Sequence, residues 1–491
     1  MVDTDLKRKV LSGIRWRAGL RFLGQLISWS ITIFVMRLLS PHDYGLMEMA
    51  TVLIAFLTMV NELGLGAALI QRREIDECIM RQIFGLLLII NASFFFLSLS
   101  AAPLAADFFK EQRLIPVIRL LSVQFVMASF VIIPQSLIDR EMLFKEKSIV
   151  ELVSAVAGSL ATLPLALGGW GVWSLVWGSL TLGLFRTVGL NLVRPYFKLP
   201  HFSFKGIGQA IFFGGYVTIA RILRFFYSQT DMIIVGKFLG RQLLGFYSVA
   251  MTLASLPMEK VSGIINQVAF PAFASIQTDT QKVSSHFLKS VRIMSLLAFP
   301  ILWGISSIAP EFVNLLLGKK WSMAIVPLQI LSLVIPVRMV SNLMSPALLG
   351  LGRADTNFFN VINASLALPV GFLIGCHWGI IGVSIAWSTI FPIVFIFNLS
   401  RTARILKITV KDVIREMASP VVAAIAMYIS VAAIKLFIPE FDYTVSLTAS
   451  VIVGAVIYGV MVITLYCDFF HLTPPNPFPF IPRFCCPTSD L

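Results

Sequence analysis

The sequence predicts an all-α, polytopic membrane protein, and two observations carry this prediction. First, 57% of the 491 residues are hydrophobic and only 13% are charged, whereas soluble proteins have about 25% charged residues. Second, continuous apolar runs such as 83–102 and 444–466 match the ~30 Å hydrocarbon core of a bilayer at ~1.5 Å rise per helical residue. These runs lack the ~10-residue alternating segments of a membrane β-barrel. We therefore expect a bundle of transmembrane helices.

Hydropathy predicts about fourteen spans, centred near residues 25, 56, 92, 126, 158, 181, 221, 256, 300, 337, 367, 388, 428 and 455. An even number of spans places both termini on one side. Of the 39 Lys and Arg residues, 24 lie on that side, 8 lie within spans and 7 lie on the other side: Arg37, Lys110, Arg113, Lys237, Arg241, Lys319 and Lys320. Basic residues favour the cytoplasmic side. The sequence thus predicts a multi-pass protein of the cytoplasmic (inner) membrane with both termini in the cytoplasm.

Composition also excludes several functional classes. The net charge of +14 is explained by topology and by contact with anionic headgroups, so no nucleic-acid partner is expected. The five cysteines and five histidines show no ligand spacing, so no metal and no cofactor is predicted. The longest segment between predicted spans is 400–417, too short for a catalytic domain, and we expect no enzymatic activity.

The chain contains an internal repeat. A shift of 200 residues aligns 21–53 with 221–253 without gaps and gives nine identities in 33 positions, against roughly three expected from residue frequencies. A weaker match pairs Gly171-Val172 with Gly382-Val383, 211 residues apart. Because six spans return the chain to the same side, the repeats are parallel.

The repeat predicts a division of the chain into four parts. These are a first six-helix lobe (1–205), a second six-helix lobe (206–400), a cytoplasmic linker with two further helices (401–466) and a proline-rich cytoplasmic tail (467–491).

The first span of each lobe carries a polar stripe at helical spacing, namely Arg17, Arg21, Gln25, Ser28 and Thr32 in the first lobe and Thr218, Arg221, Arg224, Ser228 and Asp231 in the second. A charge at the centre of a membrane helix costs ~2.5–3.5 kcal/mol, so it faces a cavity or a partner. A purely structural reading pairs Arg221 or Arg224 with an acidic residue. The repetition of Arg21 as Arg221 favours a substrate-binding role, since a single ion pair needs no symmetric copy.

The acidic residues in predicted spans allow two readings. Asp231, Glu62 and Glu259 are candidates for a coupling site, which would bind a proton or sodium ion, or for counter-ions of the arginines. Arg338 in the tenth span either lines the cavity or braces helices.

Four segments resemble a known family: LLSPHDYGLMEMATVLIAF (38–56), ELGLGAALIQRREI (62–75), FPAFASIQTDTQKV (270–283) and GKKWSMAIVPLQIL (318–331). They look like the polysaccharide-transporter branch of the multidrug/oligosaccharidyl-lipid/polysaccharide exporter superfamily, and most of all like its Wzx-type flippases of the colanic-acid exporter kind. The resemblance implies two six-helix lobes around a central cavity. It also implies movement of a polyprenyl-diphosphate-linked oligosaccharide between leaflets by alternating access, with polysaccharide assembly proteins as partners.

By this resemblance, cationic cavity residues fall on Arg21, Arg221 and Arg224. Paired guanidinium groups suit a diphosphate because they donate bidentate, charge-assisted hydrogen bonds. Gln25, Ser28 and Ser228 would line the path of the glycan.

Three alternatives remain. A peptidoglycan-precursor flippase would share the helix count and the cationic cavity. A drug or cation exporter of the same superfamily would favour an acidic cavity, which the excess of Arg in spans one and seven opposes. A membrane glycan polymerase or ligase would need a sizeable outer loop, and none is predicted.

Overall fold

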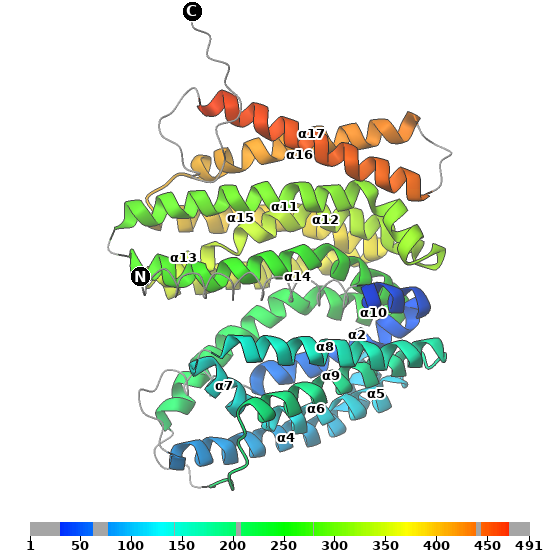
Figure 1. Cartoon of the computed structure of the whole chain (residues 1–491), viewed down its shortest axis with the longest axis vertical. Coiled ribbons are helices and arrows are strands. Elements are labelled where there is room, and N and C mark those ends of the chain that lie inside the picture. Colours follow the sequence, from blue (N-terminus) through cyan, green and yellow to red (C-terminus); the bar gives the residue numbers. More distant parts are fainter. Residues whose placement is uncertain are drawn as a thin grey trace, which may run out of the picture.

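The computed structural model describes residues 30–61, 77–141, 143–202, 208–277, 279–437 and 443–470, and these contain helices and no strand. Figure 1 shows the helices stacked along the long axis of the molecule. Their bounds are α2 Pro41–Asn61, α4 Glu77–Phe109, α5 Leu114–Leu121, α6 Val123–Ser129, α7 Ile132–Arg140, α8 Phe144–Leu167, α9 Val172–Val193, α10 Gly208–Ser275, α11 Thr280–Leu316, η1 Lys319–Ala324, α12 Ile325–Ser341, α13 Met344–Gly350, α14 Ala354–Gly375, α15 Gly379–Ile405, α16 Val410–Phe437 and α17 Tyr443–Phe470.

The all-helical membrane fold is confirmed. Within the described ranges, eight helical segments are long and apolar enough to cross a membrane, and the bent segment 114–140 would be a ninth. Every predicted centre from 56 to 455 falls inside a helix, and the centre at 25 lies outside the described residues. Fourteen crossings remain a prediction.

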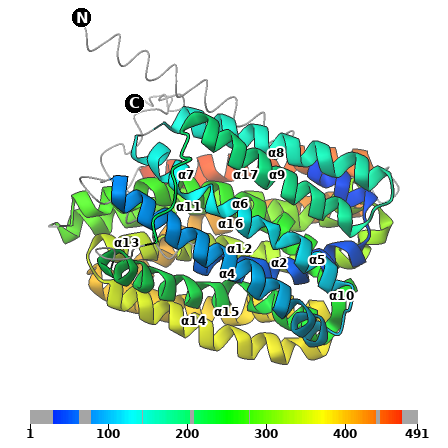
Figure 2. The same ribbon diagram turned by 90° about the horizontal axis from the view of Figure 1, so that it is seen from below.

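The helices form two groups with α10 and α2 between them. At one end of the molecule lie α4 to α9, and beyond α10 lie α11 to α15, with α16 and α17 outermost (Figure 1). The helices of both groups run in about the same direction when seen from below (Figure 2). We call the group of the helix at 30–38, α2 and α4–α9 the N-half, and the group of α10–α15 with η1 the C-half.

Helix α10 is two helices joined at a kink. Gly240 has φ 81° and ψ 175°, a conformation that glycine adopts without the steric cost that a Cβ would bring. The second part therefore starts at Arg241, and α2 starts at Pro41 after a break at 39–40. Both starts are 200 residues apart, as the repeat predicts.

The two halves meet through a reciprocal glycine contact. A Cβ on Gly45 would lie 1.7 Å from the carbonyl oxygen of Arg241, and one on Gly245 would lie 1.8 Å from that of Pro41. Because Gly45 and Gly245 are repeat equivalents, as are Pro41 and Arg241, each partner makes the contact that the other makes. This is the signature of a two-fold relation.

Beyond the second helix of each half the register of the repeat changes. The final turn of α4 closes with Glu111 N donating to Ala106 O at 2.9 Å, and the final turn of α11 closes with Gly318 N donating to Val313 O at 3.0 Å. These turns correspond at an offset of 207.

The turns before α9 and α15 correspond in the same way. Gly171 and Gly379 have φ 55° and 68° and precede or begin the two helices, at an offset of 208. The Gly-Val match at 211 therefore compares a turn residue with a residue inside α15, because it was based on residue identity and not on turn conformation.

The segment 400–417, which separates two predicted spans, is mostly helical in the structure. Helix α15 continues to Ile405 and α16 begins at Val410. The start of α16 is capped, since Thr409 Oγ1 donates to Asp412 Oδ2 at 2.8 Å and Asp412 N donates to Thr409 Oγ1 at 3.2 Å. Charged helix ends extend beyond the hydrocarbon, so hydropathy alone ends the helices too early. For the same reason α17 runs past 466, to Phe470.

Helix α16 is fastened to α11 at both ends. Lys435 Nζ lies 2.6 Å from Glu311 Oε2, and Arg292 forms an ion pair with Glu416. Tyr458 of α17 donates to Leu296 O at 2.9 Å. The pair α16–α17 is thus bound to the C-half.

Candidate functional site

Most of the predicted polar stripe cannot be placed. Arg21, Gln25, Ser28 and Glu62 lie outside the described residues. Arg221, Arg224 and Glu259 belong to α10, but their side chains are also outside what the structure describes. The binding role of these residues stays a prediction.

Thr32 of the first lobe's stripe is exposed. In the second lobe's stripe two side chains are described, those of Ser228 and Asp231, and they differ in burial. The Ser228 side chain belongs to an exposed residue and donates to Phe225 O at 3.2 Å. Asp231 is 1% exposed. Residues three apart on a helix are turned by about 60° from each other, and here that angle separates the surface of α10 from its buried side. The single polar face expected from the spacing does not extend to Asp231.

The Asp231 carboxylate is held by three hydrogen bonds. Its Oδ2 accepts from Tyr247 Oη at 2.8 Å and from Trp387 Nε1 at 3.0 Å, and its Oδ1 accepts from Met232 N at 2.9 Å. Tyr247 and Trp387 are fully buried. A carboxylate in such surroundings is stable only when its acceptor sites are satisfied, and here they are.

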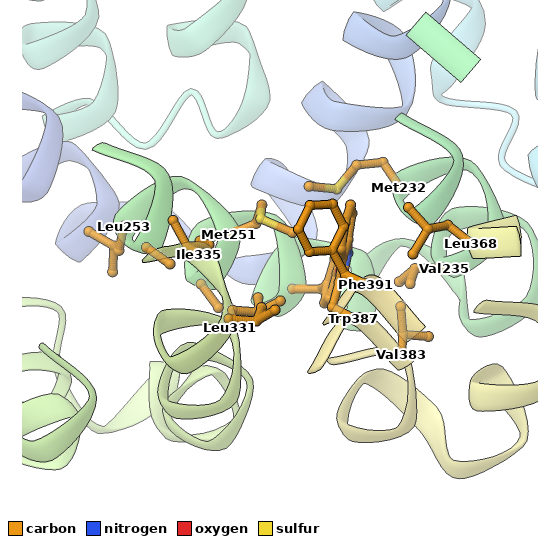
Figure 3. Packing of buried hydrophobic residues seen from close by; sticks show 14 of the residues in the cluster. Met232, Val235, Met251, Leu253, Leu331, Ile335, Leu368, Val383, Trp387 and Phe391 are labelled. Carbon is orange, nitrogen blue, oxygen red and sulfur yellow. The ribbon is translucent and has the colours of Figure 1, made fainter. Parts of the chain in front are cut away.

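Arg338 supplies the positive charge of this cluster. Its guanidinium stacks on Trp387 at 4.0 Å from the ring centroid, and it interacts electrostatically with Asp231. Figure 3 shows Trp387 beside Phe391, among Met251, Leu331 and Val383. Arg338 is only 9% exposed, so the geometry supports the reading of Arg338 as a brace. We call Asp231, Tyr247, Arg338 and Trp387 the Asp231 cluster.

The N-half contributes a second carboxylate. Glu48 of α2 is half-buried and interacts electrostatically with Asp231. Among the described residues its side chain has no hydrogen bond and no ion pair. The region between the halves therefore combines two acidic residues with Arg338.

Sequence reasoning missed Tyr247 and Trp387. They are 16 and 156 residues from Asp231, and nothing in a single sequence pairs them. A buried carboxylate does require donors, so tyrosines and tryptophans of the second lobe were the candidates to test. The described residues hold no group of His, Cys, Asp and Glu that could bind a metal.

Comparison with known proteins identifies related sequences. The family profile described as "Polysaccharide biosynthesis protein" matches residues 34–326. The lipopolysaccharide biosynthesis protein WzxC of Escherichia coli (strain K12) is 29% identical, over 78% of this chain and 78% of that protein. The teichuronic acid biosynthesis protein TuaB of Bacillus subtilis (strain 168) is 24% identical over 94% of this chain and 97% of that protein. The succinoglycan biosynthesis transport protein ExoT of Rhizobium meliloti (strain 1021) is 24% identical, over 87% of each chain.

Solved structures show a similar fold. The lipid II flippase MurJ in an inward closed conformation superposes with a TM-score of 0.75, over 92% of this chain and 99% of that chain, at 15% identity. An inward-facing multidrug resistance transporter of the MATE family gives a TM-score of 0.54 over 80% of this chain and 98% of that chain, at 14% identity. At such identities the likeness concerns the fold alone.

Proposed function

The chain belongs to the polysaccharide biosynthesis protein family, and from this premise we propose that it is a flippase for polyprenyl-diphosphate-linked oligosaccharides. It would move them from the cytoplasmic to the outer leaflet by alternating access. The observation that carries the proposal is the similarity, over 78% to 94% of this chain, to proteins named for polysaccharide biosynthesis or transport, together with a helical membrane fold built as a reciprocal pair of halves.

Transport of this substrate needs cations in the membrane and no covalent chemistry. The diphosphate would be costly to draw through hydrocarbon alone. We assign its binding to Arg21, Arg221 and Arg224, whose planar guanidinium groups match phosphate oxygens. The Asp231 cluster does not take this role, because Arg338 is already matched with Asp231. The chain would then act as a transporter and not as an enzyme.

We propose Glu48 as the residue that binds a coupling ion. It lies at the boundary between the halves, close to Asp231 and without a hydrogen-bonded partner among the described residues. Binding of a proton or sodium ion there would relieve repulsion between the two carboxylates. Asp231 itself is assigned as counter-ion of Arg338. The proposed setting is the inner membrane, with both termini in the cytoplasm and polysaccharide assembly proteins as partners.

The experiment that tests the function replaces the arginines in a strain from which the gene is deleted. The double variant Arg21→Ala, Arg221→Ala should reduce export more than about a hundredfold, because two charge-assisted bonds of ~1.5–3 kcal/mol each are lost. Lipid-linked oligosaccharide should accumulate on the cytoplasmic leaflet while the variant stays in the membrane. Lys at either position should restore export only in part, since it lacks the planar fork.

Arg119→Ala serves as the matched control. Arg119 is an exposed arginine of α5 outside the duplicated stripe, so its loss should leave export nearly unchanged. Normal export by the double variant would end the diphosphate assignment. Accumulation of a peptidoglycan precursor in the deletion strain would instead favour the alternative of a peptidoglycan-precursor flippase. This chain resembles the lipid II flippase MurJ in fold alone.

A further inference from the structure

Four of the seven basic residues on the predicted outer side gather where the two halves meet. Arg37, Lys237, Arg241 and Lys320 each bond to a group in the opposite half of the molecule. Basic residues are disfavoured on the outer side of a membrane protein. Their concentration at this boundary therefore calls for a structural purpose.

Two of these bonds form a reciprocal pair. Arg37 Nη1, in the helix before α2, donates to Leu315 O in the last turn of α11 at 3.3 Å. Lys237 Nζ, in the first part of α10, donates to Phe108 O in the last turn of α4 and lies 4.3 Å from the Phe108 ring centroid. Arg37 and Lys237 are repeat equivalents at an offset of 200, and the two acceptors are equivalents at 207.

The acceptors are carbonyls that their own helices leave without a partner. The last four carbonyls of an α-helix have no intrahelical donor. In both helices the turn is closed by a bond to a carbonyl two residues earlier, Ala106 O or Val313 O. The carbonyl two residues further on, of Phe108 or Leu315, takes a cation from the opposite half. A cation at a helix C-terminus also complements the helix dipole.

Different contacts reinforce the two sites. At the Arg37 site, Trp321 Nε1 donates to Met36 O at 2.9 Å, and the fully buried Trp321 ring packs edge-on against Tyr44 and Phe246. Lys320 donates to Leu38 O at 3.1 Å.

At the Lys237 site the reinforcement is ionic. Arg241 Nη1 lies 2.8 Å from Glu111 Oε2, and Arg241 Nε donates to His42 Nδ1 at 3.2 Å.

We infer that Arg37 with Leu315 and Lys237 with Phe108 form a two-part outer latch that holds the closed state of this end of the transporter. The latch rests on the proposed function, since alternating access requires the halves to separate here. Opening leaves each carbonyl to water and each cation free, so the latch is reversible. Because the halves move as units, both bonds break in the same step.

The test measures the separation of the halves directly. Spin labels are placed on cysteines at Gln112 and Ser322, both exposed and on opposite halves, in protein whose native cysteines are replaced. Double electron–electron resonance on the protein in nanodiscs gives the ratio of short to long distances between the two labels, which is the ratio of closed to open molecules. Arg37→Met and Lys237→Met keep the apolar stem and remove the donor. Each should lower the closed-to-open ratio about fivefold, as expected for one hydrogen bond, and the double variant should give the product.

Lys319→Met is the matched control. Lys319 is an exposed lysine on the same side, and among the described residues it makes no bond to the opposite half. Its variant should leave the distance ratio unchanged. An unchanged ratio in both latch variants, or an equal shift in the control, would overturn the latch. Because the readout is distance and not export, a failed export assay would refute the proposed substrate and leave this result standing.

Discussion

The two halves of the molecule repeat the same helices but not the same buried polar groups. At the repeat offset of 200, the N-half positions that match Asp231 and Tyr247 are Ile31 and Met47. At the offset of 208, Trp387 matches Ser179. Arg21 and Arg221, by contrast, are present in both halves.

This difference separates two kinds of polar residue. An anionic group that lies near the two-fold axis can be reached from both halves, so its ligands can be duplicated. A polar group that serves one half has no such requirement. The unmatched Asp231 cluster is accordingly an internal feature of the C-half.

The largest effect should come from removing Asp231. Asp231→Leu leaves Arg338 buried without its negative partner and takes the acceptor from Tyr247 and Trp387. We expect a loss of about 3–5 kcal/mol in stability, measured as a lower apparent melting temperature of the purified protein. Ile31→Leu, at the equivalent position, should change stability by less than about 1.5 kcal/mol.

A second substitution sharpens this result. Arg338→Met in the Asp231→Leu background removes the uncompensated charge and should recover most of the stability. If Asp231→Leu and Ile31→Leu lower the apparent melting temperature equally, the Asp231 cluster does not stabilise the C-half more than the equivalent residues stabilise the N-half.

The glycine contact should show the opposite behaviour, with equal effects in both halves. Gly45→Ala and Gly245→Ala each place a methyl group against a backbone carbonyl. We expect each to lower the free energy of unfolding by about 1–3 kcal/mol. The measurement is again the apparent melting temperature. Gly459→Ala in α17 is the control, since its Cβ would meet nothing within 4 Å and should gain about 0.5–1 kcal/mol from helix propensity. Tolerance of alanine at one of the two contact glycines but not at the other would break the reciprocity.

The smallest effect concerns the ionic reinforcement of the outer latch at the Lys237 site. The Arg241–Glu111 pair is partly exposed, with side chains 27% and 17% accessible, so Glu111→Gln should weaken closure by only about 0.5–1 kcal/mol. High salt should reproduce this loss in the unaltered protein, because the Debye length falls to ~3 Å at 1 M ionic strength and the ion pair is then screened. The distance ratio between labels at Gln112 and Ser322, followed against sodium chloride, checks it. If the distance ratio of Glu111→Gln still changes with salt as in the unaltered protein, the salt dependence comes from charges other than the Arg241–Glu111 pair.

The sequence predicted the helices well because the bilayer imposes a simple rule on them. Every span centre predicted from apolar runs, from 56 to 455, falls inside a helix. Helix ends were less predictable, as at 400–417, because Arg401 and Arg404 extend α15 into a region where hydropathy no longer reports helix.

Residue identity revealed the repeat only where the two halves still share residues, between 21–53 and 221–253. The offset of 200 correctly paired Gly45 with Gly245, and with it the start of α2 at Pro41 with the start of the second part of α10 at Arg241. The change to 207 and 208 is recorded in turn geometry, at Gly318 and Gly379, and identities between the halves are too few there to reveal it.

The candidate site was less predictable than the fold. Spacing placed Ser228 and Asp231 on one stripe, but 60° of helix rotation decides which of them meets the core. The partners of Asp231 come from later helices, and tertiary packing alone selects them.

The reciprocal glycine contact has an evolutionary consequence. An interface in which residue i meets j and j meets i is what a symmetric homodimer forms, so the contact of Gly45 and Gly245 with Arg241 and Pro41 is the one that two copies of a single ancestral half would make. In such a dimer one mutation alters both copies of the interface at once. After fusion into a single gene, each copy of the interface could change independently. The Arg37 site of the outer latch could then acquire Trp321, and the Lys237 site could acquire Glu111.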